Sequence, residues 1–155
     1  MIYTFKYISK IGELYITADE NYLLSLKFSS GYKEPDNMNN FIINETIKQL
    51  NEYFNLERKI FKLPLKLIGT DFQKQIWNQL NKIPYGETIT YKELAALAGN
   101  SKALRAAGNA CNKNPIAIII PCHRVLGINK NLTGYAGGLD KKEFLLKLES
   151  KCINK

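Results

Sequence analysis

The chain is organised around ten residues that run from Ile116 to Val125 and read IAIIIPCHRV. Apolar residues, most of them β-branched, lead into a proline, and a cysteine, a histidine and an arginine follow in succession. Such an apolar run has to be buried, so we expect Cys122 at the end of a rigid element, on or just below the floor of a cleft. Pro121 restricts its own φ and biases Ile120 toward an extended conformation.

Cys122 is the candidate nucleophile of this stretch. A thiol beside an imidazole and a guanidinium is a candidate for a depressed pKa, and the thiolate is the reactive form. The alternative is a small buried hydrophobic residue, which is how most free cysteines behave. His123 is the only histidine among 155 residues, and its place beside the thiol favours a catalytic role.

The base needs a partner that the local sequence does not supply. Adjacent side chains diverge in an extended backbone, so direct contact between Cys122 and His123 requires a turn here, and otherwise a water can carry the proton. A third group, a carboxylate, usually orients such a base. Spacing leaves every carboxylate of the C-terminal half open: Asp71, Glu87, Glu93, Asp140, Glu143 and Glu149.

Composition narrows the class of protein. Apolar residues make up 45% of the chain and charged residues 23%, as in globular domains. We find no apolar run of ~18 residues and no signal-peptide pattern, and therefore expect a cytoplasmic protein that does not contact a membrane. The three cysteines are far apart and lack C-x-x-C spacing, so we expect neither a disulfide framework nor a metal site.

The net charge of +8 is concentrated in the second half of the chain. Residues 1–70 contain 9 Lys and Arg against 8 Asp and Glu, whereas residues 71–155 contain 13 against 6. This asymmetry indicates a polyanion as partner of the C-terminal half. The alternative is that lysine simply fills exposed positions in a lysine-rich sequence.

The N-terminal part is predicted to be a small sheet with one helix. Residues 2–8, 13–18 and 22–28 favour strands of an antiparallel meander, and residues 29–40 favour a loop. Apolar spacing predicts a helix over residues 41–55. After a connector we place the domain boundary at residue 68, which gives an N-terminal domain of residues 1–68 and a C-terminal domain of residues 69–155.

Helices dominate the C-terminal part. Thr70 is expected to cap the first helix, and Thr90 with Glu93 to form a capping box on the second. Ser101 is expected to cap a third helix that extends to about Cys111, and Asp140 to cap a final one. The second and third helices have the length and connection of a helix-turn-helix.

The third helix is poorly suited to reading bases in the major groove of DNA. Arg105 is its one long base-reading side chain, which is too few for the major groove. Its small residues permit contact by shape and backbone, or docking in the minor groove. The alternative is a tight helix–helix contact.

Pro121 to Val125 resembles the active-site signature of the O6-alkylguanine-DNA alkyltransferases, also called methylated-DNA–protein-cysteine methyltransferases. Residues 72–149 are similar to that family nearly throughout, whereas the first 70 residues agree in kind alone. The resemblance implies an α+β fold, with a ribonuclease H-like N-terminal sheet plus helix and a helical, winged helix-turn-helix-like C-terminal domain. Its landmarks are Tyr91–Ala95, Ala98–Asn100, Arg105–Gly108, Asn114-Pro115, the cysteine signature and Tyr135–Leu139.

The family's activity is DNA repair by direct, irreversible and stoichiometric alkyl transfer. By resemblance, Cys122 takes the alkyl group from O6-alkylguanine, and from O4-alkylthymine, in duplex DNA after nucleotide flipping. His123 takes the thiol proton through a water beforehand, and Glu149 orients the imidazole. Tyr91 donates a proton to the departing guanine, and Asn114 braces the turn before the cysteine. No cofactor is implied, and the partner is double-stranded DNA bound by a monomer.

The resemblance also assigns DNA contacts and a base pocket. Arg105 fills the space that the flipped nucleotide leaves. Further DNA contacts fall to Gln73, Tyr91, Lys92 and Asn100. The pocket is implied to be formed by Val125, Tyr135, Ala136 and Gly137.

Two positions depart from many members of the family. Ala136 stands where a serine is common, which removes a hydroxyl contact to O6 of guanine. Ala117 stands where some members have proline, which predicts a roomier pocket. The N-terminal part also lacks the ligands with which some relatives bind zinc, so we expect no metal.

Three alternatives belong to other classes of protein. A non-catalytic lesion-binding protein of the alkyltransferase-like kind shares the scaffold but has another residue in place of the nucleophile, so Cys122 argues against it. A helix-turn-helix regulator is disfavoured by the poor recognition helix. A cysteine hydrolase differs in that it would turn over.

Overall fold

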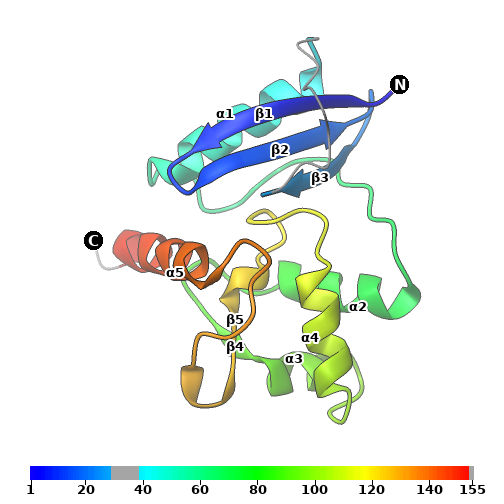
Figure 1. Cartoon of the computed structure of the whole chain (residues 1–155), viewed down its shortest axis with the longest axis vertical. Coiled ribbons are helices and arrows are strands. Elements are labelled where there is room, and N and C mark those ends of the chain that lie inside the picture. The colour runs from blue at the N-terminus through cyan, green and yellow to red at the C-terminus, as the bar shows by residue number, and fades with distance from the viewer. Residues whose placement is uncertain (29–38, 154–155) are drawn as a thin grey trace. The chain divides into compact units, whose positions relative to one another are not determined.

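A computed structural model describes residues 1–28 and 39–153 of the chain. Most of the loop expected at residues 29–40 lies outside the described residues. The chain divides into two compact units, Met1–Leu67 and Ile68–Lys155. An antiparallel sheet with one helix forms the first unit and a set of helices the second (Figure 1). The predicted α+β class is confirmed.

Unit 1 is the predicted meander with one helix. Its strands are β1 (Tyr3–Ser9), β2 (Gly12–Ala18) and β3 (Leu23–Lys27), which pair antiparallel in the order β1-β2-β3. The helix α1 (Phe41–Phe54) covers one face of this sheet (Figure 1). Its core consists of apolar side chains from both layers: Leu14, Ile16, Leu23, Leu26, Leu50 and Tyr53.

Unit 2 begins with α2 (Asp71–Asn81), β4 (Ile89–Thr90), α3 (Tyr91–Leu97) and α4 (Leu104–Asn112). The 3-10 turn η1 (Cys122–Arg124) leads into β5 (Val125–Leu126), which pairs parallel with β4. The turn η2 (Ile128–Lys130) and the long helix α5 (Leu139–Ile153) complete the unit.

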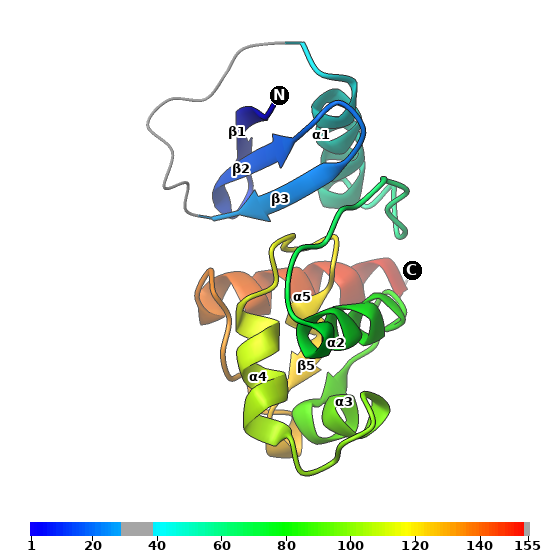
Figure 2. The same cartoon turned by 90° about the vertical axis from the view of Figure 1, so that its right-hand side faces the viewer.

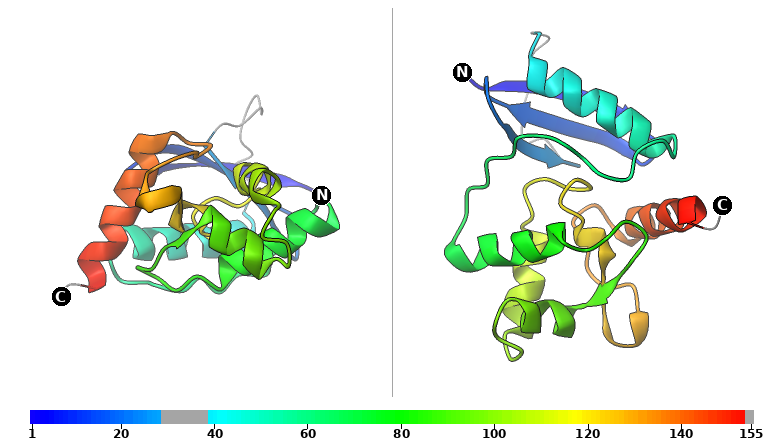
Figure 3. Two further views of the ribbon diagram at one scale, coloured as in Figure 1. Left: turned by 90° about the horizontal axis from the view of Figure 1, so that it is seen from below. Right: turned by 180° about the vertical axis from the view of Figure 1, so that it is seen from behind.

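Helix α4 packs against α2 and α3, and α5 contacts η1 (Figure 2). The segment that carries η1 lies between α2 and α5, as the views from below and behind show (Figure 3). The thiol-bearing turn is therefore enclosed by helices from both ends of the unit.

Two of the four predicted helix N-caps are confirmed. Thr70 caps α2 and Thr90 caps α3, each in a full capping box, with Gln73 and Glu93 as the reciprocal partners. The Ser101 cap is wrong: α4 begins at Leu104, after Ala103, and has no side-chain cap.

The two remaining boundaries have local physical reasons. The Asn100 side chain accepts a hydrogen bond from the Lys102 N–H at 3.1 Å, and its carbonyl accepts one from the Ala103 N–H at 3.0 Å. These bonds form a turn where a helical turn was predicted. The expected Asp140 cap is also wrong, because α5 already starts at Leu139 and Asp140 lies in its first turn, where a carboxylate favours the helix dipole.

The apolar run before the cysteine is buried as predicted, but it is not extended. Ile116, Ile118 and Ile120 are all at most 1% exposed. The Ile120 N–H donates to the Ile116 carbonyl at 3.0 Å, so the run folds back on itself. Ile118 has φ of 70°, a costly conformation for a β-branched residue.

Candidate active site

Cys122 opens the turn η1, and backbone hydrogen bonds hold it on both sides. Its N–H donates to the Ile120 carbonyl at 2.8 Å, and the Arg124 N–H donates to the Pro121 carbonyl at 3.0 Å. Val125, the next residue, pairs with Ile89 of β4. The cysteine is 9% exposed, so little of it is open to solvent.

His123 and Arg124, which follow Cys122 directly, form a buried polar cluster with Glu149. The imidazole Nε2 lies 2.6 Å from Oε2 of Glu149. Arg124 donates to both oxygens of the same carboxylate, from Nε at 2.8 Å and from Nη2 at 3.0 Å. Its Nη1 donates to the Ile83 carbonyl at 2.7 Å. A bidentate guanidinium–carboxylate pair is strong and directional, so Arg124 determines where the carboxylate lies.

The cluster determines the protonation state of the histidine. Burial lowers the pKa of His123 below 6.5, against the opposing effect of Glu149. Burial disfavours the charged form of Glu149, but hydrogen bonds from His123 and Arg124 outweigh it and hold the pKa of that carboxyl far below its usual range. A neutral imidazole therefore donates from Nε2 to an ionised carboxylate, and its Nδ1 is left as an acceptor.

Nδ1 of His123 is a buried polar atom without a hydrogen-bond partner among the described residues 1–28 and 39–153. A buried acceptor without a partner is costly, and ordered water commonly satisfies such groups. This atom therefore suits a water that links the imidazole to the neighbouring thiol.

The pKa of the Cys122 thiol is raised, although the adjacent histidine and arginine in the sequence suggested a lowered one. Burial raises the pKa of Cys122, and a hydrogen bond from Asn114 and the charge of Lys142 oppose this only in part. The expected depressed pKa is therefore not found. The physical reason is that the imidazole is neutral and the guanidinium is paired with Glu149, so neither offers the thiolate a free positive charge.

Asn114 ties the segment before the cysteine together. Its Nδ2 donates to the Ile120 carbonyl at 2.7 Å, and its Oδ1 accepts from the Ile116 N–H at 3.0 Å. Both ends of the apolar run thus bind one carboxamide. Replacing Asn114 would remove both its hydrogen bonds to the backbone of the apolar run and its hydrogen bond to the Cys122 thiol.

Lys142 is a site residue that sequence reasoning missed. Its side chain is buried, and its ammonium donates to the carbonyls of Thr133 at 2.8 Å and Gly134 at 3.2 Å. It also lies 5.6 Å from the centroid of the Tyr91 ring. The sequence offered one signal, a lysine at a position on the buried face of α5. It was missed because the buried face was assigned from apolar residues alone.

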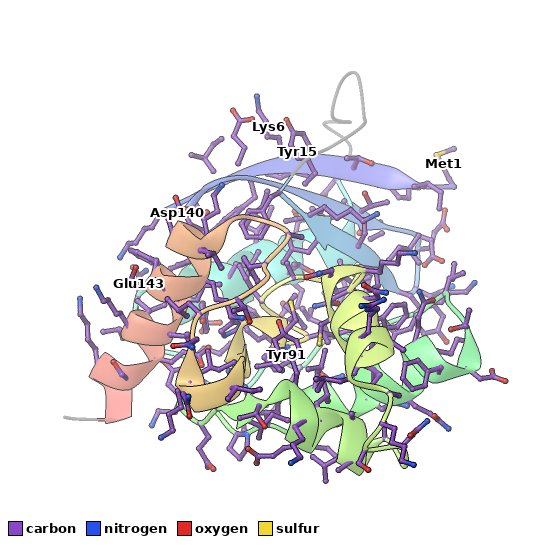
Figure 4. The ribbon with its side chains drawn as sticks, turned by 60° about the horizontal axis from the view of Figure 1, so that its bottom comes forward. Met1, Lys6, Tyr15, Tyr91, Asp140 and Glu143 are labelled. Atoms are coloured by element: carbon purple, nitrogen blue, oxygen red, sulfur yellow. The ribbon has the colours of Figure 1, made fainter. Side chains whose placement is uncertain are left out.

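Tyr91 contacts the same segment from the other side. Its hydroxyl donates to the Thr133 carbonyl at 3.1 Å, and Figure 4 shows its side chain at the centre of unit 2, beside α4. Burial holds the pKa of Tyr91 well above its usual value. Tyr91 and Lys142 therefore clamp one short piece of backbone, Thr133–Gly134.

A groove of about 600 Å³ opens next to this clamp. Its walls come from α3, α4 and the segment 127–134. The groove is lined by three of the expected DNA-contact residues, Tyr91, Lys92 and Arg105. Gln73 and Asn100 instead take part in the α2 capping box and in the turn before α4.

The residues expected around the base lie elsewhere. Within the described part of the chain, the groove lining does not include Cys122 or the expected pocket residues Val125, Tyr135, Ala136 and Gly137. Val125 is fully buried. Cys122 and these four residues therefore do not form the walls of this groove.

Neither a metal cluster nor a membrane helix is found in the described parts of the chain. Residues 1–28 and 39–153 contain no group of three or more His, Cys, Asp and Glu side chains that could hold a metal ion. No helix in these ranges has both the length and the apolarity needed to cross a bilayer.

The fold and site define a class of protein: a buried cysteine backed by a histidine–carboxylate pair, on a unit with helix-turn-helix-like helices. Comparison with known families narrows the class. Residues 1–67 match the family model described as 6-O-methylguanine DNA methyltransferase, ribonuclease-like domain. Residues 71–151 match the model of that methyltransferase's DNA binding domain.

Individual proteins agree with the family models. The chain is 52% identical to a methylated-DNA–protein-cysteine methyltransferase of Methanosarcina acetivorans, over 93% of this chain and 96% of the relative. It is 42% identical to the constitutive enzyme of Bacillus subtilis, over 90% of each. The O6-methylguanine methyltransferase of Mycobacterium tuberculosis shares its fold, with a TM-score of 0.87, 40% identity and coverage of 97% and 94%.

The chain belongs to the methylated-DNA–protein-cysteine methyltransferase family. The resemblance seen in the sequence is thereby confirmed.

Proposed function

We propose that this protein repairs DNA by moving an alkyl group from O6 of guanine in duplex DNA to Sγ of Cys122. Each molecule acts once, because the thioether formed has no built-in route of hydrolysis. The observation that carries the proposal is the buried Cys122 beside a neutral histidine whose free Nδ1 can accept a proton. Family membership supplies the substrate class.

The proposed step begins with the proton. The thiol passes it through a water to Nδ1 of His123, and Glu149 stabilises the imidazolium that forms. The sulfur then attacks the alkyl carbon while the bond from that carbon to O6 breaks. Guanine leaves with one added proton, donated by Tyr91. The step balances when the tyrosine recovers a proton from solvent and the His123 imidazolium releases its own.

We also propose that the lesion leaves the helix to react. A cysteine that is only 9% exposed cannot reach a base inside a duplex, so the nucleotide must be extruded. Arg105, exposed on α4 at the groove, would fill the vacated space. Lys92, Asn100 and Gln73 would bind the DNA backbone. The protein would act as a monomer in the cytoplasm.

One experiment tests the transfer. The protein is incubated with duplex DNA that contains O6-methylguanine, and intact mass and a peptide map are then recorded. We expect one added methyl group, confined to the peptide that carries Cys122, and none on a Cys122→Ala variant that still binds DNA. Methyl on that variant would contradict the assignment. Unmodified protein with tight lesion binding would indicate the lesion-binding alternative, and repeated turnover a hydrolase.

A second experiment tests extrusion of the nucleotide. Arg105→Ala should slow transfer from duplex DNA far more than reaction with free O6-benzylguanine, which needs no extrusion. Similar losses with both substrates would exclude this role for Arg105.

A further inference from the structure

Two asparagines on α4 face the groove and have no part in the mechanism above. Asn109 and Asn112 both line the groove and are exposed. Neither carboxamide makes a hydrogen bond with another residue of the described ranges. Each therefore presents a free donor and a free acceptor to whatever occupies the groove.

These asparagines continue a line that starts at Arg105. The spacing of Arg105, Asn109 and Asn112 places all three on one face of the helix, over ~10 Å along its axis. Gly108 lies on the same side, and a Cβ built there would meet no atom within 4 Å. The helix surface beside this line is therefore open to a bulky ligand.

The inner end of the line meets the clamp. A Cβ built on Gly134 would lie 3.6 Å from Oδ1 of Asn112 and 3.4 Å from the Tyr91 hydroxyl. Asn112 and Tyr91 thus flank the same backbone position. The line thus begins at Arg105, which is proposed to replace the flipped nucleotide, and ends near Tyr91, which is proposed to protonate the departing guanine.

The extent of the groove indicates which part of a nucleotide it holds. The thiol does not line the groove, so the reacting base must pass beyond it toward Cys122. A base held at Cys122 would leave its sugar and phosphates in the groove. A volume of about 600 Å³ lies within the usual range of small-molecule sites, ~300–1,000 Å³.

We propose that Asn109 and Asn112 bind the sugar and phosphate oxygens of the extruded nucleotide and so stabilise its extrahelical state. This inference rests on the proposed function and assigns positioning residues to it. The carboxamides are neutral, so they add hydrogen bonds without counterion release. They act on guanine and thymine nucleotides alike, because the backbone is common to both.

The test compares substrates with and without a backbone. Asn109→Ala, Asn112→Ala and the double variant react with duplex DNA containing O6-methylguanine and with free O6-benzylguanine. Asn81→Ala, at the exposed end of α2 and outside the groove, is the matched control. Alanine favours helices, and Trp77 fluorescence checks that each variant is folded.

We expect each single variant to lose on the order of threefold to tenfold in duplex transfer, the worth of one hydrogen bond. The rate with free O6-benzylguanine and the salt dependence of DNA binding should stay at the level of Asn81→Ala. Unchanged duplex transfer, or equal loss on both substrates, would overturn the inference. Failure of the wild-type protein to take up methyl would instead overturn the proposed function.

Discussion

At the scale of single residues, Arg124 determines the position of the Glu149 carboxylate and, through it, the orientation of His123. It does not activate the thiol directly, since its guanidinium is engaged with both oxygens of Glu149. A buried pair of this kind stabilises little by itself but becomes costly when one partner is removed.

Glu149→Gln should therefore destabilise the protein and slow transfer. The change leaves the Arg124 charge buried without its counter-charge, which typically costs about 3–5 kcal/mol in unfolding free energy. Denaturant unfolding followed by the fluorescence of Trp77, the one tryptophan, measures the loss.

Glu143→Gln on the same helix is the matched control. Its carboxylate forms an exposed pair with Lys147 at 3.0 Å, so less than about 1 kcal/mol should be lost. Equal losses in the two variants would show that Arg124 does not depend on Glu149.

Lys142→Met should raise the pKa of Cys122 further and slow transfer. Methionine retains much of the buried stem but removes the ammonium, whose charge lowers that pKa and whose hydrogen bonds hold Thr133 and Gly134. The rate of thiol alkylation by iodoacetamide as a function of pH measures the shift.

Lys147→Met, at an exposed position of α5, should leave the alkylation profile of wild type unchanged. The idea fails if Lys142→Met has the same profile as this control. Lys142→Arg, which retains a charge, should lie between the two.

At the scale of elements, the capping boxes determine where the helices of unit 2 begin. In α2 the Thr70 hydroxyl accepts from the Gln73 N–H at 3.1 Å, and the Gln73 side chain accepts from the Thr70 N–H at 3.0 Å. Helix α2 in turn positions Trp77, whose indole donates to the Ala110 carbonyl of α4 at 2.9 Å. The start of α2 is thus connected to the helix that lines the groove.

Thr70→Ala should lower the unfolding free energy by about 1 kcal/mol, the usual cost of a lost N-cap. Chemical denaturation with Trp77 fluorescence as the signal measures it. Thr88→Ala is the control, because Thr88 is exposed and lies outside any helix. If the two variants unfold alike, the capping box contributes nothing measurable.

At the scale of the whole molecule, the chain consists of two units, and the described elements of the reaction all belong to the second. The buried cluster couples the stability of unit 2 to pH. Because the native His123 has a pKa below 6.5, the unfolded chain binds a proton more readily than the native one. Stability is therefore lost as the pH falls.

The unfolding free energy should decline as the pH falls from about 7 to about 5. It should decline again below the ordinary carboxyl value of 4.5, because the pKa of Glu149 is depressed in the native state. Equilibrium denaturation at a series of pH values measures both steps. Since His123 is the only histidine, His123→Gln should flatten the first step, and an unchanged slope would contradict this origin.

Local sequence was sufficient for the parts that depend on near neighbours. Thr70 and Thr90 could be assigned as caps because each bonds within three residues, and the meander follows from short strands with short connections. Burial of the run before Cys122 follows from its apolar composition alone. The candidate nucleophile was likewise visible in the sequence, since one cysteine lies beside the only histidine.

Tertiary structure alone decided the partnerships that span the chain. Spacing left six carboxylates open and only the family resemblance pointed to Glu149. The fold brings this residue, 26 positions away, to 2.6 Å from His123. The direction of the Cys122 pKa shift depends on burial and on a guanidinium that folding directs to Glu149. Lys142 is a site residue because the start of α5 brings its ammonium to the carbonyls of Thr133 and Gly134, nine and eight residues earlier in the chain. Electrostatics and burial depend on distances in space, which sequence spacing does not contain.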